Sequence, residues 1–149
     1  MDGLVASDPL YAERVRDSFQ RQNAMRFIGA SLVRVEPGYA EIELPYRDEL
    51  TQQHKFFHGG ITTMIADSAG GYAAYSLFPA DASVLTVEFK MSLLAPAAGE
   101  KLVASARVVK PGRTLTLCDV EVHAVEGEKR TLVLKGLETL ICLHGKADR

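Results

Sequence analysis

HGGITTMIADSAGGYAAYSL, residues 58–77, contains the longest apolar stretch of this sequence. From about residue 59 to residue 77 the stretch is rich in alanine, glycine, isoleucine and methionine, and Asp67 is its only charged residue. A helix that is apolar all round is normally buried. The small side chains around Asp67 would allow close packing or leave room for a ligand. We therefore predict a buried helix that lies against a sheet.

The sequence on both sides of this helix predicts strands. Residues 31–36 and 39–44 precede it, and Pro37-Gly38 between them is a turn signal. Four longer strands follow, punctuated by proline and glycine, at residues 83–94, 101–109, 114–125 and 130–143. Strands joined by short turns pair antiparallel. We predict an α+β fold in which one sheet of about six strands packs on the helix and leaves its other face to solvent or another subunit.

The N-terminal part predicts a further helix over residues 9–27. Asp8 can cap it, and Pro9 would occupy its first position, where the missing N–H costs nothing. Gly29 is expected to end it. Residues 45–57, between the second strand and the central helix, are predicted to form a polar loop. One domain would then span residues 1–149, with residues 1–29 as an N-terminal extension.

Composition excludes several classes of protein. The chain has 149 residues, 47% of them hydrophobic and 24% charged, which is ordinary for a soluble globular protein. The net charge of −2 and the lack of a basic stripe argue against nucleic-acid binding. No apolar stretch is long enough to span a membrane, and the N-terminus has no signal-peptide pattern, so we expect a cytoplasmic protein. Cys118 and Cys142 form no CxxC pair and are expected to be small buried hydrophobes.

Asp67 is the first candidate for chemistry. Burial of an unpaired carboxylate is costly, so this side chain must be hydrogen-bonded, protonated or directed into a pocket. Buried carboxylates in pockets commonly serve as general bases or nucleophiles. The alternative is an Asp that bonds backbone groups or lies at a partly exposed subunit edge.

His58-Gly59-Gly60 lies just before the helix and is the second candidate. The first N–H groups of a helix have no intrahelical partner and carry the positive end of the dipole, so they can stabilise an oxyanion. The same residues could instead form an ordinary junction between loop and helix. A metal site built from His54, His58 and Asp67 is not expected, because the loop is not evidently helical and the HExxH glutamate is missing.

Taken together, His58-Gly59-Gly60, Asp67 two helical turns on, and the small residues that follow it resemble the core motif of the PaaI-type hotdog-fold thioesterases. The resemblance covers nearly the whole chain after the N-terminal helix, including residues 86–90 and Pro96. It implies a hotdog fold and an enzyme that hydrolyses acyl-CoA thioesters. It also implies that no metal or other cofactor is needed, and that the protein is a homodimer or a tetramer of paired dimers.

The resemblance also implies roles for individual residues. The N–H of Gly59 would polarise the thioester carbonyl, and Asp67 would attack it or activate water. Thr86, or less favourably Ser83, would place the water. Gln52 would contact the carboxylate or the carbonyl, and His58 would be structural or lie beside the thioester. In a dimer, Gly59 and Gln52 would come from one subunit, and Asp67 and Thr86 from the other.

Further residues are expected to contact the substrate: Gly60, Ser68, Gln53, Phe57, Lys90 and Arg113. Arg113, in the turn with Pro111, is the first choice for the CoA phosphates, although such charges often lie at solvated strand ends. This chain has Gln52 where many family members have Asn, and Lys55 where many have Gly. These differences, with the bulky Phe56 and Phe57, bear on the acyl group rather than on the reaction.

Two other classes of function compete with hydrolysis. A non-catalytic acyl-CoA-binding hotdog protein would keep the pocket but would not need Asp67. An enoyl-CoA hydratase of the same fold would need its own Asp and His signature, which is not seen. The sequence leaves aryl, arylacetyl and medium-chain fatty thioesters open as substrates.

Overall fold

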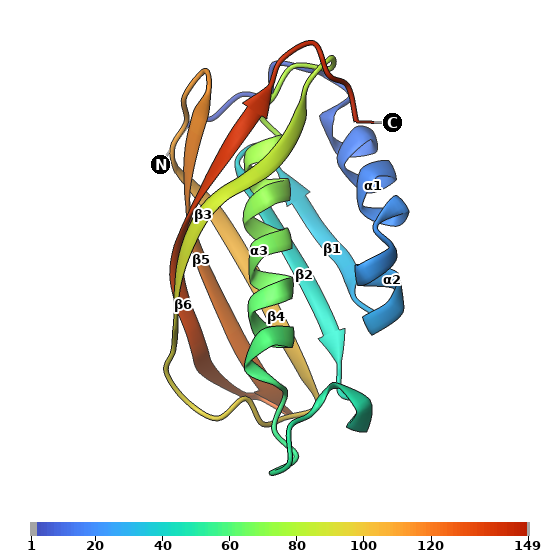
Figure 1. The fold of residues 1–149 in the computed structure, drawn as a ribbon, viewed down its shortest axis with the longest axis vertical. Coiled ribbons are helices and arrows are strands. Elements are labelled where there is room, and N and C mark those ends of the chain that lie inside the picture. The colour runs from blue at the N-terminus through green and yellow to red at the C-terminus, as the bar shows by residue number, and fades with distance from the viewer. Residues whose placement is uncertain (1–2, 149) are drawn as a thin grey trace.

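The computed structural model describes residues 3–148 and shows a curved antiparallel sheet wrapped around one long helix (Figure 1). The helix is α3 (Gly59–Tyr75). The strands are β1 (Ser31–Glu36), β2 (Tyr39–Pro45), β3 (Ser83–Leu93), β4 (Lys101–Lys110), β5 (Leu115–Glu126) and β6 (Lys129–Leu143). The predicted α+β architecture is therefore confirmed, and the strand bounds differ from the predicted ones by one residue at most.

The order of strands in the sheet is β1-β2-β4-β5-β6-β3. Consecutive strands pair in β1–β2, β4–β5 and β5–β6, as short connections predict. The same rule is wrong for β3 and β4, because both edges of β4 are already occupied by β2 and β5. β3 instead pairs with β6, so β1 and β3 form the two edges of the sheet within residues 3–148.

The helix α3 packs on the concave face of the sheet through its small residues. Ala66, Ala69 and Ala73 are fully buried there. The helix ends at Tyr75, two residues before the predicted end. Ser76 follows, and its hydroxyl donates to Ala73 O and accepts the N–H of Gly38, each at 2.7 Å. These two hydrogen bonds link the turn between β1 and β2 to the end of the helix.

The predicted N-terminal helix is interrupted. It consists of α1 (Tyr11–Arg21) and α2 (Asn23–Ile28), which flank Gln22 in an extended conformation with ψ 104°. The side chain of Gln22 donates to the Tyr72 hydroxyl on α3 at 3.1 Å, and this contact ties the break to the central helix. Gly29, at φ 82°, ends α2 as predicted.

The start of α1 also differs from the prediction. Asp8 accepts the Leu10 N–H at 2.9 Å and pairs with Arg14 at 2.8 Å. The helix itself begins only at Tyr11, so Pro9 precedes its first residue. Asp8 therefore caps the turn that leads into the helix.

Cys118 and Cys142 are free and buried, as predicted. The loop before α3 contains one short 3-10 helix, η1 (Asp48–Leu50). Between residues 3 and 148, no helix is long and apolar enough to cross a membrane. The cytoplasmic location stays a prediction.

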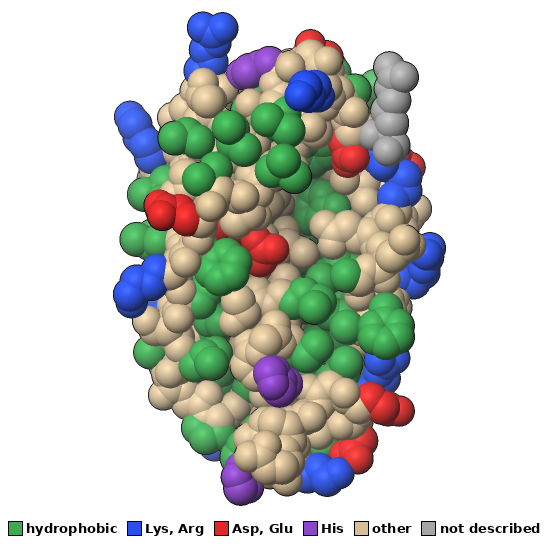
Figure 2. Space-filling view, in the orientation of Figure 1, with side chains coloured by type: hydrophobic (Ala, Val, Ile, Leu, Met, Phe, Trp, Pro, Cys, Tyr) green, Lys and Arg blue, Asp and Glu red, His purple; other side chains and the backbone are tan. Residues whose placement is uncertain are grey.

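The strand β3 exposes large apolar side chains along the free edge of the sheet. The exposed fraction is 59% for Leu85, 53% for Val87 and 47% for Phe89. Leu93 and Leu94, further along the chain, are exposed to a similar extent. Figure 2 shows hydrophobic side chains gathered over this part of the molecule. An apolar edge strand is a template for pairing with another chain.

Candidate active site

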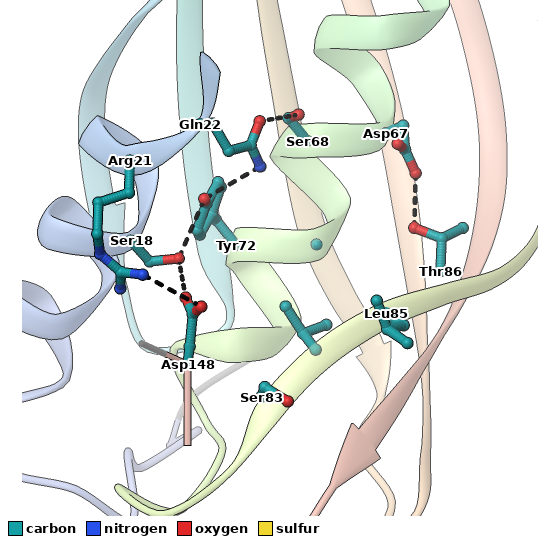
Figure 3. Close-up of a pocket in the computed structure, with 12 residues that line it drawn as sticks. Ser18, Arg21, Gln22, Asp67, Ser68, Tyr72, Ser83, Leu85, Thr86 and Asp148 are labelled. Atoms are coloured by element: carbon teal, nitrogen blue, oxygen red, sulfur yellow. Dashed lines mark hydrogen bonds and ion pairs between the residues drawn. The ribbon is translucent and has the colours of Figure 1, made fainter. Parts of the chain in front are cut away.

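Asp67 lies midway along α3 on the side that faces β3 (Figure 3). Its Oδ1 accepts a hydrogen bond from Thr86 Oγ1 at 2.7 Å. The carboxylate is half-buried and borders a cavity of about 500 Å³. Ser68 and Ser83 line the same cavity, so four of the predicted site residues lie together.

A β-bulge positions Thr86. The pairing of β3 with β6 runs from Thr86–Leu140 directly to Glu88–Thr139, so Val87 is the extra residue. Bulges re-aim the side chains beside them and are common next to active sites. Thr86 shares the inward face with buried Leu140, and this orientation brings its hydroxyl to Asp67.

Glu138 is a residue of this site that sequence reasoning missed. Its side chain is fully buried in β6, and Oε1 lies 3.2 Å from Thr86 Oγ1. Burial, and then the nearby Asp67 carboxylate, raise the pKa of Glu138 to about 10. One feature of the sequence indicates that Glu138 is buried. Alternation in this strand puts position 138 on the same face as Leu134, Leu140 and Cys142, where a carboxylate is out of place.

Gly70 on α3 leaves room for Glu138. A Cβ at position 70 would lie 1.7 Å from Glu138 Oε2. At the next residue, Gly71, a Cβ would meet nothing within 4 Å, because this position faces the cavity. The two neighbouring glycines therefore serve different purposes, one in packing and one in shaping the open space beside Asp67.

The far wall of the cavity is a polar network from α1, α3, the break at Gln22 and the C-terminal segment (Figure 3). The Tyr72 hydroxyl lies 3.2 Å from Ser18 Oγ and accepts from Gln22, whose Oε1 accepts from Ser68 at 3.4 Å. Ser18 also donates to Asp148. Burial raises the pKa of Tyr72, so its hydroxyl keeps its proton at neutral pH. The break at Gln22 thus supplies an amide group to this wall.

A second, smaller hollow of about 330 Å³ lies at the start of α3. Gln52, Phe57 and Gly59 line it together with Leu93. Gly59 is the first helical residue, so its N–H has no intrahelical acceptor. The neighbouring N–H of Gly60 is already taken by Nδ1 of His58 at 2.9 Å, which makes His58 the cap of the helix.

Within one chain these two groups of residues do not meet. Asp67 lies eight positions after Gly59, and a rise of 1.5 Å per residue puts them about 12 Å apart along α3. A thioester carbonyl bound at the Gly59 N–H is therefore out of reach of the Asp67 in the same chain.

The other predicted substrate contacts lie outside both hollows. Gln53 is exposed in the loop before α3. Lys90 is exposed on β3, where Nζ donates to Ser92 Oγ at 3.2 Å. Arg113 lies in a third hollow near Phe78, and its backbone oxygen lies 2.7 Å from Nε2 of His144. In the part of the chain that the structure describes, no three His, Cys, Asp or Glu side chains are grouped so as to hold a metal ion.

The family model described as "Thioesterase superfamily" matches residues 54–131, just over half of the chain. The chain belongs to the thioesterase superfamily. A putative esterase from Halobacterium salinarum is 32% identical over 127 residues, which cover 82% of each chain. Acyl-coenzyme A thioesterase PaaI from Escherichia coli is 27% identical over 118 residues, 78% of this chain and 80% of the relative.

Solved structures agree with this membership. A thioesterase family protein from Silicibacter pomeroyi is 47% identical, with a TM-score of 0.89 over 91% of this chain and 99% of that one. The structure of Escherichia coli PaaI, at 19% identity, shows the same fold, with a TM-score of 0.83 over 93% and 96% of the two chains. The predicted hotdog fold, PaaI-type family and thioester-hydrolysing class of enzyme are thus confirmed.

Proposed function

We propose that this thioesterase hydrolyses an acyl-CoA thioester to the free acid and CoA, with Asp67 as its base or nucleophile. The observation that carries the proposal is the half-buried Asp67 carboxylate, held by Thr86 at the edge of a cavity of about 500 Å³. Cavities of this size are typical of small-molecule sites. The similarity to acyl-coenzyme A thioesterase PaaI of Escherichia coli supports CoA as the carrier.

The complete site combines two copies of the chain. Gly59 and Gln52 of one copy and Asp67 and Thr86 of the other would border one thioester, because the two groups lie too far apart in a single chain. The apolar free edge of β3 supports this arrangement, since Thr86 belongs to that edge. A symmetric pair of copies contains two such sites. Tetramers would be pairs of these dimers.

The reaction needs only side chains, backbone and water in this proposal. The thioester carbonyl accepts the Gly59 N–H, which stabilises negative charge on its oxygen. Asp67 takes a proton from water as the water oxygen attacks the carbonyl carbon, or attacks directly to give an anhydride that water then opens. The C–S bond breaks and CoA leaves as a thiolate. No metal or redox cofactor takes part.

The acyl group would lie in the cavity, over Gly71 and toward Tyr72. This placement predicts that Gly71→Leu, which fills open space, excludes bulky acyl groups while short ones still react. Turnover of short and long acyl-CoA thioesters measures the change. Equal loss for all chain lengths would contradict the placement. Lys90 and Arg113 remain the candidates for the CoA phosphates.

The decisive experiment measures free-thiol release from aryl-, arylacetyl- and fatty-acyl-CoA thioesters. Wild type, Asp67→Asn and Asp81→Asn are compared, because Asp81 is an exposed carboxylate beyond the end of α3 and serves as the matched control. We expect Asp67→Asn to lose several orders of magnitude in kcat and Asp81→Asn to stay at the wild-type value. A folded Asp67→Asn variant with near-native turnover contradicts the proposal. Binding without thiol release would favour a non-catalytic acyl-CoA-binding protein.

A further inference from the structure

Three polar side chains from three elements converge at the wall of the cavity. Asp67 comes from α3, Thr86 from β3 and Glu138 from β6. Oγ1 of Thr86 lies 2.7 Å from Asp67 Oδ1 and 3.2 Å from Glu138 Oε1. Gly70 is the position on α3 that makes space for Glu138. The fold thus accommodates a carboxyl group in its core immediately behind the proposed catalytic residue.

The hydrogen atoms in this cluster can be counted. A threonine hydroxyl has one proton to donate and two lone pairs that accept. The shorter contact assigns that proton to Asp67. An ionised Glu138 would then face the lone pairs of Thr86 Oγ1 without any proton between the two oxygens. A neutral Glu138 supplies the missing proton.

We propose that Glu138 is a positioning residue: as a neutral carboxylic acid it donates to Thr86 Oγ1 and so fixes the Thr86 hydroxyl on Asp67. The inference rests on the proposed role of Asp67. In this arrangement, two successive hydrogen bonds, from Glu138 to Thr86 and from Thr86 to Asp67, hold the Asp67 carboxylate in one orientation toward the cavity.

The surroundings of Glu138 favour the neutral form. Among the described residues, no cation forms an ion pair with it, and Oε2 accepts no hydrogen bond, while the Asp67 carboxylate lies within hydrogen-bonding reach of Glu138. A buried anionic oxygen without a partner is far more costly than a neutral one. The titratable groups that face it are Asp67 and the thiol of Cys118. The raised pKa described above agrees with this environment.

Two variants separate a neutral donor from an anion. Glu138→Gln keeps a donor of the same length without any charge, so kcat should stay within about threefold of wild type. Glu138→Met has a similar length but no donor. Its kcat should fall about 10- to 100-fold, with KM little changed, because a displaced catalytic group is costly to the rate. Wild-type kcat in Glu138→Met, or equal damage in both variants, overturns the proposal.

The path through Thr86 is tested by a double-mutant cycle. Thr86→Val removes the hydroxyl that links the two carboxyl groups. In that background, the difference in kcat between Glu138→Gln and Glu138→Met should disappear, because coupling between residues in one network shows as non-additivity. A difference of the same size as in the wild-type background would show that Glu138 acts without Thr86, and would overturn the stated path.

Infrared spectroscopy provides a test that does not depend on turnover. Wild type at pH 7 should show the carbonyl stretch of a protonated carboxyl group, and Glu138→Gln should lack it. This measurement stands even if Glu138→Met fails to fold. If wild type releases no thiol, the proposed function is refuted but the neutral state of Glu138 is not. If the protonated band is absent, the neutral state of Glu138 is refuted.

Discussion

The backbone N–H of Gly59 can be removed without breaking α3. Proline is well tolerated at the first helical position, and His58 before it has the extended ψ of 137° that proline requires of its neighbour. Gly59→Pro should therefore fold, yet lower kcat by about 10²- to 10³-fold through loss of one oxyanion donor. Steady-state thiol release, with circular dichroism to confirm the helix, checks this prediction.

Gly59→Ala is the matched control for that experiment. Its Cβ also approaches Leu93 Cδ1, at 2.8 Å, but the N–H is retained. The end of the leucine side chain can move aside, so kcat should remain near the wild-type value. Equal kcat in the proline and alanine variants would remove the Gly59 N–H from the mechanism.

At the level of residues, the sequence draws attention to polar groups that stand out against their neighbours. Asp67 was visible as the single charge in an apolar helix, and the family motif led from it to Thr86. Glu138 was overlooked because a glutamate in a strand usually faces solvent. Only the pairing of β6 with β3 shows that its side chain lies next to Thr86. The roles of these residues still await experiment.

The two central glycines of α3 should respond in opposite ways to substitution by alanine. Gly70→Ala puts a Cβ against Glu138 in a filled core, and overpacking of this kind costs about 1–3 kcal/mol. Gly71→Ala adds a methyl group in open space and should raise the free energy of unfolding by up to about 1 kcal/mol through helix propensity. Urea unfolding at one protein concentration measures both. Similar stabilities for the two variants would contradict the packing described here.

The buried carboxyl group of β6 should make stability depend on pH. Its pKa is about 10 in the native protein, against an ordinary value of 4.5, so the native state binds a proton that the unfolded chain has lost. The stabilisation is complete below pH 4.5 and is lost as the pH rises toward 10. Between these limits, the wild-type free energy of unfolding should fall more steeply than that of Glu138→Gln, by at most about 1.4 kcal/mol per pH unit. Parallel curves from urea unfolding at a series of pH values would be inconsistent with a neutral Glu138.

At the level of elements, local sequence signals predict where helices and strands lie. Long-range contacts determine where the N-terminal helix breaks and which strand pairs with β3. Turn residues and alternation placed all six strands within one residue. The break at Gln22 was not visible, because it depends on a contact with Tyr72 fifty residues away. The crossing of β3 to the far edge depends on which strand edges remain open, a property of the whole sheet.

For the whole molecule, a mixing experiment tests whether the site needs two copies. Asp67→Asn and Gly59→Pro are each expected to be inactive, but a mixed dimer has one intact site. Random exchange of subunits should then restore about a quarter of wild-type activity, since half of the dimers are mixed and each has one of two sites. Thiol release after unfolding and refolding of the mixture measures the recovery.

The control mixture pairs Asp67→Asn with Thr86→Val. Both changes affect the same half of the proposed site, so every mixed dimer has two damaged sites and activity should not exceed the average of the parents. Recovery in both mixtures, or in neither, would argue against the division of the site between subunits.

The free edge of β3 carries both the apolar side chains that would meet a second copy and the threonine that holds Asp67. In the proposed dimer, substrate binding and subunit association are therefore thermodynamically linked. The factor by which a bound thioester tightens the dimer equals the factor by which dimerisation tightens thioester binding. Dilution would weaken substrate affinity, and saturating substrate would offset dilution. The cellular concentration of the chain would then become one of the quantities that sets its catalytic output.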